Sequence, residues 1–355
     1  MRSDNPSWFS WPFARLWNRS TPNADRPVYI FGPDLSQPQP NNIDVAIAPR
    51  GTGAISAQVP DSTVVGGNKR GDNSVDFQIT RTSIDKVSAG SQSFIGSGNN
   101  NRAAGVQSVV CGGNFNTAGN VQSVVCGGES NSATGTLAVV AGGSGNTASG
   151  SSAVISGGGS NSSSGLTSVV SGGQSNLADG TNSVVPGGNG ATTRGLTGRL
   201  SFSSGTFASG GDAQYGLIVL RRSTTDSAPL AITSTNVGAS SINIPVLPNS
   251  CIYAFRGQVV CIQTAGVAGA VNDCKAWDIV GSIKRGANAA STALLGTPTI
   301  TVLGADTNLG ADNATGAVIA ITADTSAGGL LITVTGETDK TLRWVATVHT
   351  TEVDY

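Results

Sequence analysis

A fifteen-residue repeat occupies the middle of the chain and limits what it can fold into. A Gly-Gly pair recurs with this period at 112–113, 127–128, 142–143, 157–158, 172–173 and 187–188. Two β-branched residues and one small residue precede each pair, and an Asn follows four positions after its first Gly in all but the last repeat. Fifteen residues are too few for a repeat that contains a helix, but they suffice for two strands of about five residues and two tight corners. The repeat therefore predicts a parallel β-roll over 88–197, with coils stacked about 4.8 Å apart.

The apolar content of each repeat is low. One or two aliphatic residues per coil cannot fill a three-sided β-helix, so the pattern favours a two-layer roll that leaves valine on its surface. We expect Gly and Asn to form the corners, because these residues accept positive φ angles at low cost. Exposed valine on every coil requires a partner surface, and this predicts an oligomer.

The composition excludes several classes of protein. Charged residues make up 12% of the chain, and 49 of its 355 residues are Gly, against about 25% charged residues and about 7% Gly in an average soluble domain. Gly disfavours helices, and a net charge of −1 indicates no nucleic-acid partner. Disordered chains combine low hydrophobicity with high net charge, whereas 38% of this chain is hydrophobic. An all-β protein remains.

The first region, residues 1–81, is rich in proline, which excludes long helices and central strands. We expect an extended arm with short strands near 28–31 and 44–48. Its aromatic residues are predicted to dock on another protein, since Trp is common at interface hot spots. The alternatives are an arm that folds back on its own oligomer and a membrane-surface helix. The docking residues are Trp8, Phe9, Trp11, Phe13 and Trp17.

The last region, residues 205–355, alternates short apolar runs with turn residues, which is typical of an antiparallel β-sandwich of jelly-roll type. We expect Trp277 and Trp344 to pack in its core rather than to serve as sugar platforms. The predicted strands are 215–220, 231–235, 241–246, 251–264, 274–285, 297–302, 317–324, 330–335 and 341–352. Polar loops at 265–273, 304–313 and 336–340 are the expected recognition surface. Their candidate contact residues are Asn272, Asp273, Asp306, Asn308, Asp312 and Asn313.

The sequence offers no recognisable catalytic arrangement. The single His, His349, has no partnered nucleophile, and three spaced cysteines make a poor metal site. Cys111 and Cys126 occupy equivalent repeat positions that elsewhere hold Ala, Ser or Pro, which favours a small structural residue over a redox pair. We therefore expect no enzyme, no cofactor and no metal. The chain has no apolar run of transmembrane length and no signal peptide at its start, so we expect synthesis in a cytoplasm with reduced cysteines.

The repeat units resemble a known family. SVVCGGNFNTAG, SVVCGGESNSATG, AVVAGGSGNTASG and SVVSGGQSNLADG are similar to the head repeats of trimeric autotransporter adhesins. The resemblance implies a left-handed parallel β-roll packed three around an axis, and hence a homotrimer.

The whole layout resembles bacteriophage tail-fibre and receptor-binding proteins. The matching blocks are 47–54, 66–71 and 75–78 before the repeats, and 277–298 and 342–353 after them. The resemblance implies a virion tail protein whose arm holds a baseplate or tail protein and whose C-terminal domain binds a host-surface glycan or outer-membrane receptor. Two alternatives stay open, a purely structural fibre or decoration protein and a polysaccharide-degrading tailspike.

Overall fold

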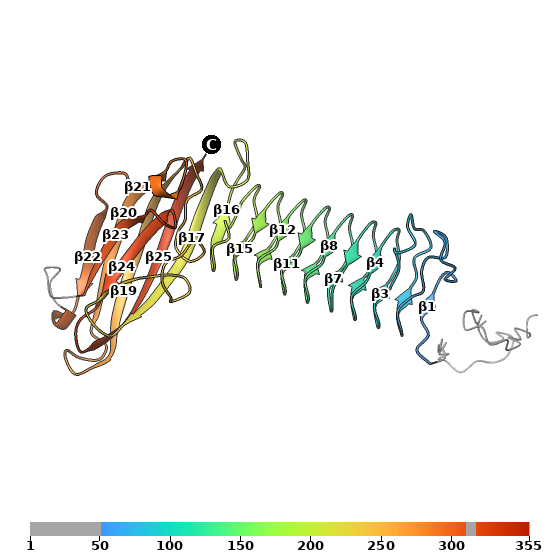
Figure 1. Cartoon of the computed structure of the whole chain (residues 1–355), viewed down its shortest axis with the longest axis horizontal. Coiled ribbons are helices and arrows are strands. Elements are labelled where there is room, and N and C mark those ends of the chain that lie inside the picture. Colours follow the sequence, from blue (N-terminus) through green and yellow to red (C-terminus); the bar gives the residue numbers. More distant parts are fainter. Residues whose placement is uncertain (1–50, 310–316, 355) are drawn as a thin grey trace, which may run out of the picture.

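The computed structural model describes residues 51–309 and 317–354. A parallel β-solenoid is followed by an antiparallel C-terminal domain (Figure 1). Helical structure in the described ranges is limited to two 3-10 turns, η1 (Ala289–Ser291) and η2 (Thr307–Leu309). No helix among the described residues is long and apolar enough to cross a bilayer. The all-β class, the parallel repeat region and the antiparallel C-terminus are confirmed. The strands expected at 28–31 and 44–48 lie outside the described residues.

The solenoid has two rows of parallel strands. The first row is β1 (Ile55–Ser56), β2 (Val75–Asp76), β3 (Phe94–Ile95), β5 (Val109–Val110), β7 (Val124–Val125), β9 (Val139–Val140), β11 (Val154–Ile155), β13 (Val169–Val170) and β15 (Val184–Val185). The second is β4 (Arg102–Ala103), β6 (Thr117–Ala118), β8 (Ser132–Ala133), β10 (Thr147–Ala148), β12 (Ser162–Ser163) and β14 (Leu177–Ala178). Each strand has two residues, fewer than the five expected, because corners with positive φ interrupt the extended backbone on both sides.

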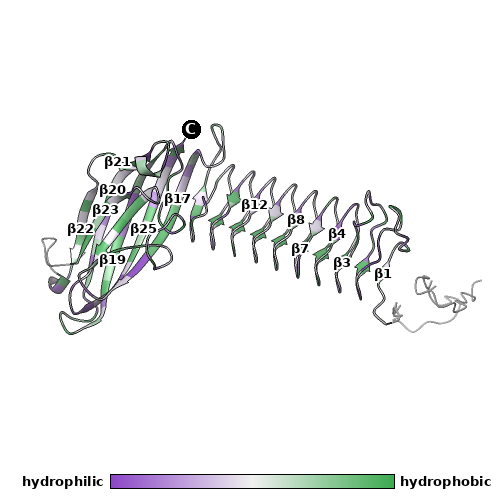
Figure 2. Ribbon diagram, in the orientation of Figure 1, coloured by the Kyte–Doolittle hydropathy of each residue, from purple (hydrophilic) through white to green (hydrophobic). Residues whose placement is uncertain are grey.

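The core of the solenoid is one side chain deep on each side. In β9, Val139 points outward and is half-buried, whereas Val140 is fully buried. The facing row contributes a small buried residue such as Ala133 or Ala148. The outward residues of the first row, from Val109 to Val184, form the valine row, whose strands are coloured as hydrophobic in Figure 2. The thin core and the surface valines are both as the repeat predicts.

The glycines serve two different purposes. The second Gly of each pair has positive φ, for example 88° at Gly143. It also lies close to the next coil, because a Cβ on Gly143 would lie 2.1 Å from the carbonyl oxygen of Gly158. The Gly at the opposite corner is needed for space alone: a Cβ on Gly150 would lie 2.1 Å from the carbonyl oxygen of Gly165 in the next coil. Positive φ at that corner falls two residues later, on residues such as Leu137 and Thr167.

The repeated asparagines are not corner residues, which corrects the expectation. They are buried and form a continuous ladder along the solenoid. The amide of Asn146 donates to the carbonyl oxygens of Gly142 and Gly158, both at 2.9 Å, and its Oδ1 accepts the backbone N–H of Asn161 at 3.0 Å. The members of the ladder are Asn101, Asn116, Asn131, Asn146, Asn161 and Asn176.

The N-terminal coils of the solenoid contain a buried ion cluster. Asp76 of β2 lies 2.9 Å from Nε of Arg70 and 3.8 Å from Nη2 of Arg81. All three side chains are buried, and Gln78 beside them donates to the carbonyl oxygen of Asn101 at 2.8 Å. These contacts compensate the buried carboxylate of Asp76 where the regular coils begin.

The C-terminal domain continues the first row of the solenoid. β16 (Leu200–Phe202) pairs in parallel with β15 and antiparallel with β17 (Ala213–Thr224). The sheet then runs through β25 (Lys340–Asp354), β19 (Cys251–Gly266) and β20 (Cys274–Arg285), to which β21 (Ala293–Leu294) and β22 (Thr299–Ala305) pair. A separate sheet has the order β18 (Pro229–Ala231), β24 (Gly329–Thr335) and β23 (Val318–Asp324).

The two sheets of this domain share one apolar core. Trp277 and Trp344 are each 1% exposed and stack with ring centroids 5.7 Å apart, so both pack in the core as expected. No strand forms at 241–246, which corrects that prediction. Asn243 makes a local turn there instead, since its side chain accepts the N–H of Ser240 at 2.7 Å and donates to Gly238 at 2.9 Å.

A buried carboxylate fastens the solenoid to this domain. Glu352 of β25 is 1% exposed and pairs with Arg199, and its Oε2 lies 3.3 Å from Nε of Arg194. Gln214 donates to the same oxygen at 2.8 Å. Burial raises the pKa of Glu352, but the two guanidinium groups outweigh burial, so the pKa lies below its usual value of 4.5.

The ladder predicts a large loss of stability for Asn146→Ala. The substitution removes three hydrogen bonds and leaves buried backbone groups unpaired, so we expect the free energy of unfolding to fall by about 2–4 kcal/mol. Denaturant unfolding followed by far-UV circular dichroism measures it. Asn114→Ala, at a half-buried position outside the ladder, is the control, and equal losses in the two variants would contradict the ladder.

The junction predicts acid sensitivity. Because its folded pKa is lowered, Glu352 stabilises the native state above about pH 4.5 and loses this contribution as the pH falls through the folded pKa. Glu352→Gln should lower the free energy of unfolding by about 3–5 kcal/mol at pH 7, since it leaves buried arginine charge uncompensated. The stability of this variant should also fall less steeply as the pH is lowered. Tryptophan-monitored unfolding at several pH values tests this. Asp278→Asn, which breaks an ion pair with the exposed Arg256, should change little.

Candidate functional site

The strands of the large sheet carry the predicted loops to the end of the domain farthest from the solenoid (Figure 1). β17 starts beside the solenoid and pairs with β25 from Ala213↔Val353 to Thr224↔Leu342. The beginning of β25 and the end of β19 are therefore distal, as the pair Gly266↔Lys340 confirms. The loops at 267–273 and 336–339 and the turn η2 lie at this end, which we call the distal face.

Asp306 joins two strands at the distal face. Its Oδ2 accepts the backbone N–H of Cys274 at 2.9 Å and the thiol of Cys274 at 3.4 Å, and its own N–H donates to the carbonyl oxygen of Cys274 at 2.9 Å. The hydrogen bond to Asp306, followed by its negative charge, raises the pKa of the Cys274 thiol. The carboxylate is thus occupied with holding the start of β20 to the end of β22.

Asn272 and Asp273 shape the loop between β19 and β20. Asn272 has a φ of 80°, and its N–H donates to the carbonyl oxygen of Gln263 at 2.9 Å. Oδ2 of Asp273 accepts the N–H of Ala270 at 2.7 Å. The side chain of Asn272 is exposed, whereas that of Asp273 is partly used by its own turn.

A buried lysine connects two of the three loops. Nζ of Lys340 donates to the carbonyl oxygen of Asn308 and lies 2.5 Å from Oε2 of Glu337. The other oxygen of Glu337 accepts the N–H of Ala317 at 3.0 Å. Lys340 is 5% exposed, so its charge is compensated inside the domain, and the side chain of Asn308 stays exposed above it.

The structure brings four of the expected contact residues to one face, namely Asn272, Asp273, Asp306 and Asn308. Asp312 and Asn313 lie outside the described residues, as do the docking residues Trp8, Phe9, Trp11, Phe13 and Trp17. The sequence analysis missed Lys340, Glu337 and Gln263. A lysine and a glutamate three positions apart at a strand start were the available signal, but their link to Asn308 depends on the fold.

The outer face of the large sheet is a second polar surface that the sequence analysis did not single out. The hydroxyl of Tyr215 hydrogen-bonds Nδ1 of His349, and the ring centroids lie 5.8 Å apart. Next to His349 across the sheet, Arg256 lies 3.5 Å from Asp278. Exposed aliphatic residues flank these groups, among them Val219, Ile252, Val260 and Val345.

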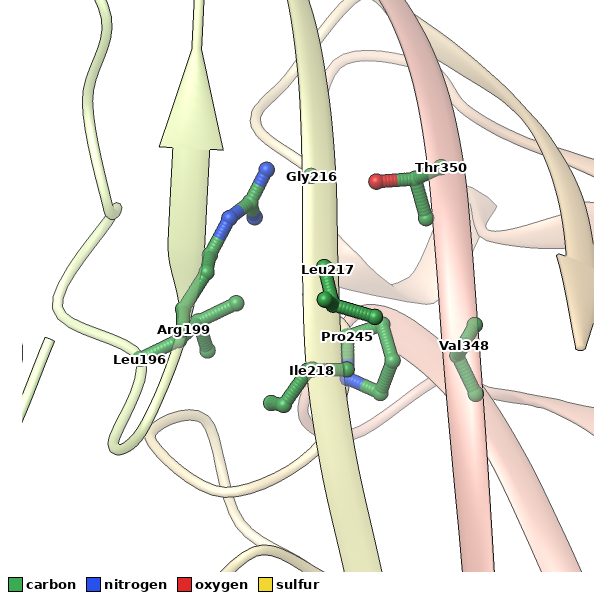
Figure 3. A pocket seen from close by; sticks show the side chains of 8 residues that line it. All are labelled: Leu196, Arg199, Gly216, Leu217, Ile218, Pro245, Val348 and Thr350. Carbon is green, nitrogen blue, oxygen red and sulfur yellow. The ribbon is translucent and has the colours of Figure 1, made fainter. Parts of the chain in front are cut away.

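One small cavity lies between the solenoid and the domain (Figure 3). Its volume of about 10 Å³ is close to the minimum for a single water molecule, so it is not a substrate site. The residues that line it are Leu196, Arg199, Gly216, Leu217, Ile218, Pro245, Val348 and Thr350.

Comparison with protein-family models found no match, and no curated protein matches the chain. Among solved structures, the chain is similar to the tailspike protein of Acinetobacter phage vB_ApiP_P1, with 9% identity, a TM-score of 0.22, and coverage of 85% of this chain and 74% of that one. The chain is also similar to the tailspike protein gp49 of Acinetobacter baumannii bacteriophage Fri1, with 8% identity and a TM-score of 0.22. The match covers 78% of this chain and 61% of that one. A third similar structure is the tailspike protein of A. baumannii phage AM24, with 10% identity and a TM-score of 0.21. The match covers 81% of this chain and 60% of that one.

These comparisons bear on one prediction. The tailspike of phage Fri1 is described as a capsular polysaccharide depolymerase, which contradicts the expectation that this chain is not an enzyme. That exclusion rested on the absence of familiar motifs, and a catalytic pair assembled from distant strands or neighbouring chains leaves no motif in the sequence. A likeness of this size places no catalytic residue and assigns no substrate in this chain.

Proposed function

We propose that the chain is a homotrimeric receptor-binding protein of a bacteriophage tail. The N-terminal arm within residues 1–81 attaches it to a baseplate or tail protein. The solenoid, which begins at β1, is a stiff spacer, and the distal face contacts a glycan or outer-membrane receptor on the host. The observation that carries the proposal is the continuous sheet that runs from the first coils into the C-terminal domain. It supports a rod that presents one face away from its attachment point, in line with the resemblance of the sequence to tail-fibre proteins.

The valine row supports the trimer. Val139, Val154 and Val169 lie in the middle of the solenoid and remain partly exposed in the single chain. Complete burial of an exposed aliphatic side chain contributes about 1.5–3 kcal/mol. Each half-buried valine gains part of this value on association, so the row as a whole favours assembly. The row continues through Leu200 and Leu217 toward the outer face of the large sheet.

The distal face supports contact with a hydroxyl-rich ligand. Asn308 and Asn272 present exposed amide groups, which both donate and accept hydrogen bonds. Their backbone positions are held by Lys340 and Gln263, so little ordering is required on binding. Three such faces in a trimer would raise the strength of attachment by avidity.

A charged residue in the valine row is expected to prevent assembly. Val154→Lys should convert a particle of three times 35.4 kDa into single chains, because a lysine in an apolar interface is costly to desolvate. Light scattering measures the mass. Ser151→Lys, at an exposed corner of the same coil, should remain trimeric, and a single-chain mass for the unmodified protein would overturn the trimer.

The distal face predicts loss of cell binding without loss of folding. Asn272→Gly with Asn308→Ala removes two exposed amides and keeps the positive φ that the loop needs, so we expect at least a tenfold weaker attachment to host cells. The measurement is flow cytometry of labelled trimer on a panel of bacterial strains. Asn114→Ala on the solenoid is the control, and unchanged binding by the double variant would refute the assignment.

Incubation of the trimer with capsular polysaccharide shows which class of receptor-binding protein the chain belongs to. Release of reducing sugar ends would make it a degrading tailspike. Binding without release would support an adsorption fibre, and a trimer that binds no strain would favour a purely structural fibre.

A further inference from the structure

Two of the five cysteines lie side by side on the solenoid. Cys111 and Cys126 directly follow β5 and β7, in which Val110 is the register partner of Val125. The N–H of Cys111 donates to the carbonyl oxygen of Val125 at 3.0 Å. Both are free thiols on exposed residues. Because they occupy the same position in neighbouring coils, their side chains project in the same direction.

The spacing of the coils suits a disulfide. Adjacent β-strands lie about 4.7–4.9 Å apart, and Cα atoms joined by a disulfide are usually about 4.4–6.8 Å apart. The two side chains interact, since burial and then the neighbouring Cys126 raise the pKa of the Cys111 thiol.

This arrangement occurs once among the described coils. The equivalent position holds Ala141, Ser156, Ser171 and Pro186 in the following repeats. The other cysteines differ, because Cys251 and Cys261 are buried in β19 and Cys274 is exposed with its thiol against Asp306. An exposed cysteine far from the pair is thus available as an internal reference.

We propose that Cys111 and Cys126 form an intramolecular disulfide that staples two adjacent coils when the protein meets a small-molecule disulfide such as oxidised glutathione. The thiolate of Cys111 attacks one sulfur of the oxidant, forms a mixed disulfide and releases one glutathione thiolate. The thiolate of Cys126 then attacks the sulfur of Cys111 and releases the second glutathione. The two cysteines are oxidised, one molecule of oxidant is reduced, and the two thiol protons go to solvent.

The staple acts on a single coil boundary and is independent of what the distal face binds. It closes a loop of fifteen residues, which reduces the freedom of the unfolded chain. The stability of a solenoid is approximately a sum over neighbouring repeats. The disulfide therefore strengthens one boundary and leaves the others unchanged.

Oxidation of the purified full-length protein tests the proposal. The reduced protein is incubated with oxidised glutathione at about pH 8.5, where thiolate forms, then unfolded and alkylated. Phe115 lies between the two cysteines, so chymotryptic cleavage there leaves peptides joined only by the disulfide. We expect this cross-linked pair, a glutathione adduct on Cys274, and a melting temperature raised by roughly 5 °C.

Two variants complete the design. Cys126→Ser should leave Cys111 with a single glutathione adduct and abolish the shift in melting temperature. Cys274→Ser should keep both the cross-link and the shift. The proposal is overturned by separate glutathione adducts on Cys111 and Cys126, by thiols that remain open to alkylation while Cys274 reacts, or by a disulfide that joins two chains on a non-reducing gel.

Discussion

The close approach of backbone to backbone between adjacent coils is the constraint on which the rest of the structure depends. A Cβ on Gly165 would lie 2.1 Å from the carbonyl oxygen of Gly180 in the following coil, so no side chain fits there. The asparagine ladder then carries hydrogen bonds from coil to coil in the same register. An inserted residue would displace both the glycine corner and the ladder, which explains a period that does not slip over six repeats.

Both ends of such a stack present an edge that can pair with another chain. At the N-terminal side, β1 is the outermost described strand of the first row, and Asp76 of the neighbouring β2 pairs with Arg70 and Arg81. At the other side, Leu200 pairs in parallel with Val184 and antiparallel with Leu217, so the parallel row passes directly into the antiparallel sheet. The edge is thereby covered by the chain's own next element, and Glu352 holds the two parts together.

The repeat could be predicted from the sequence because its cause is local. In each of the six repeats, a Gly-Gly pair follows two β-branched residues, and the structure has a corner at the glycines and a strand at the β-branched pair. Only one of the three hydrogen bonds of Asn146 is local, the one to Gly142, whereas Gly158 and Asn161 belong to the next coil. The sequence therefore predicts a corner and not a ladder. The expected strand at 241–246 failed because Asn243 makes a turn that outweighs apolar alternation. The loops of the distal face were foreseen from their polarity, whereas the bridge from Lys340 to Asn308 required the fold.

The coil-to-coil hydrogen bonds have a mechanical consequence, because those between neighbouring strands within each row point along the axis of the rod. A pull on the distal face loads every coil boundary in turn with the same force, as in a chain of links joined in series. Rupture then begins at the weakest boundary, and a rod with more coils is longer but no stronger. Tensile strength is therefore decided by the least well-bonded pair of neighbours, whereas reach is decided by the number of repeats, and the two can change independently.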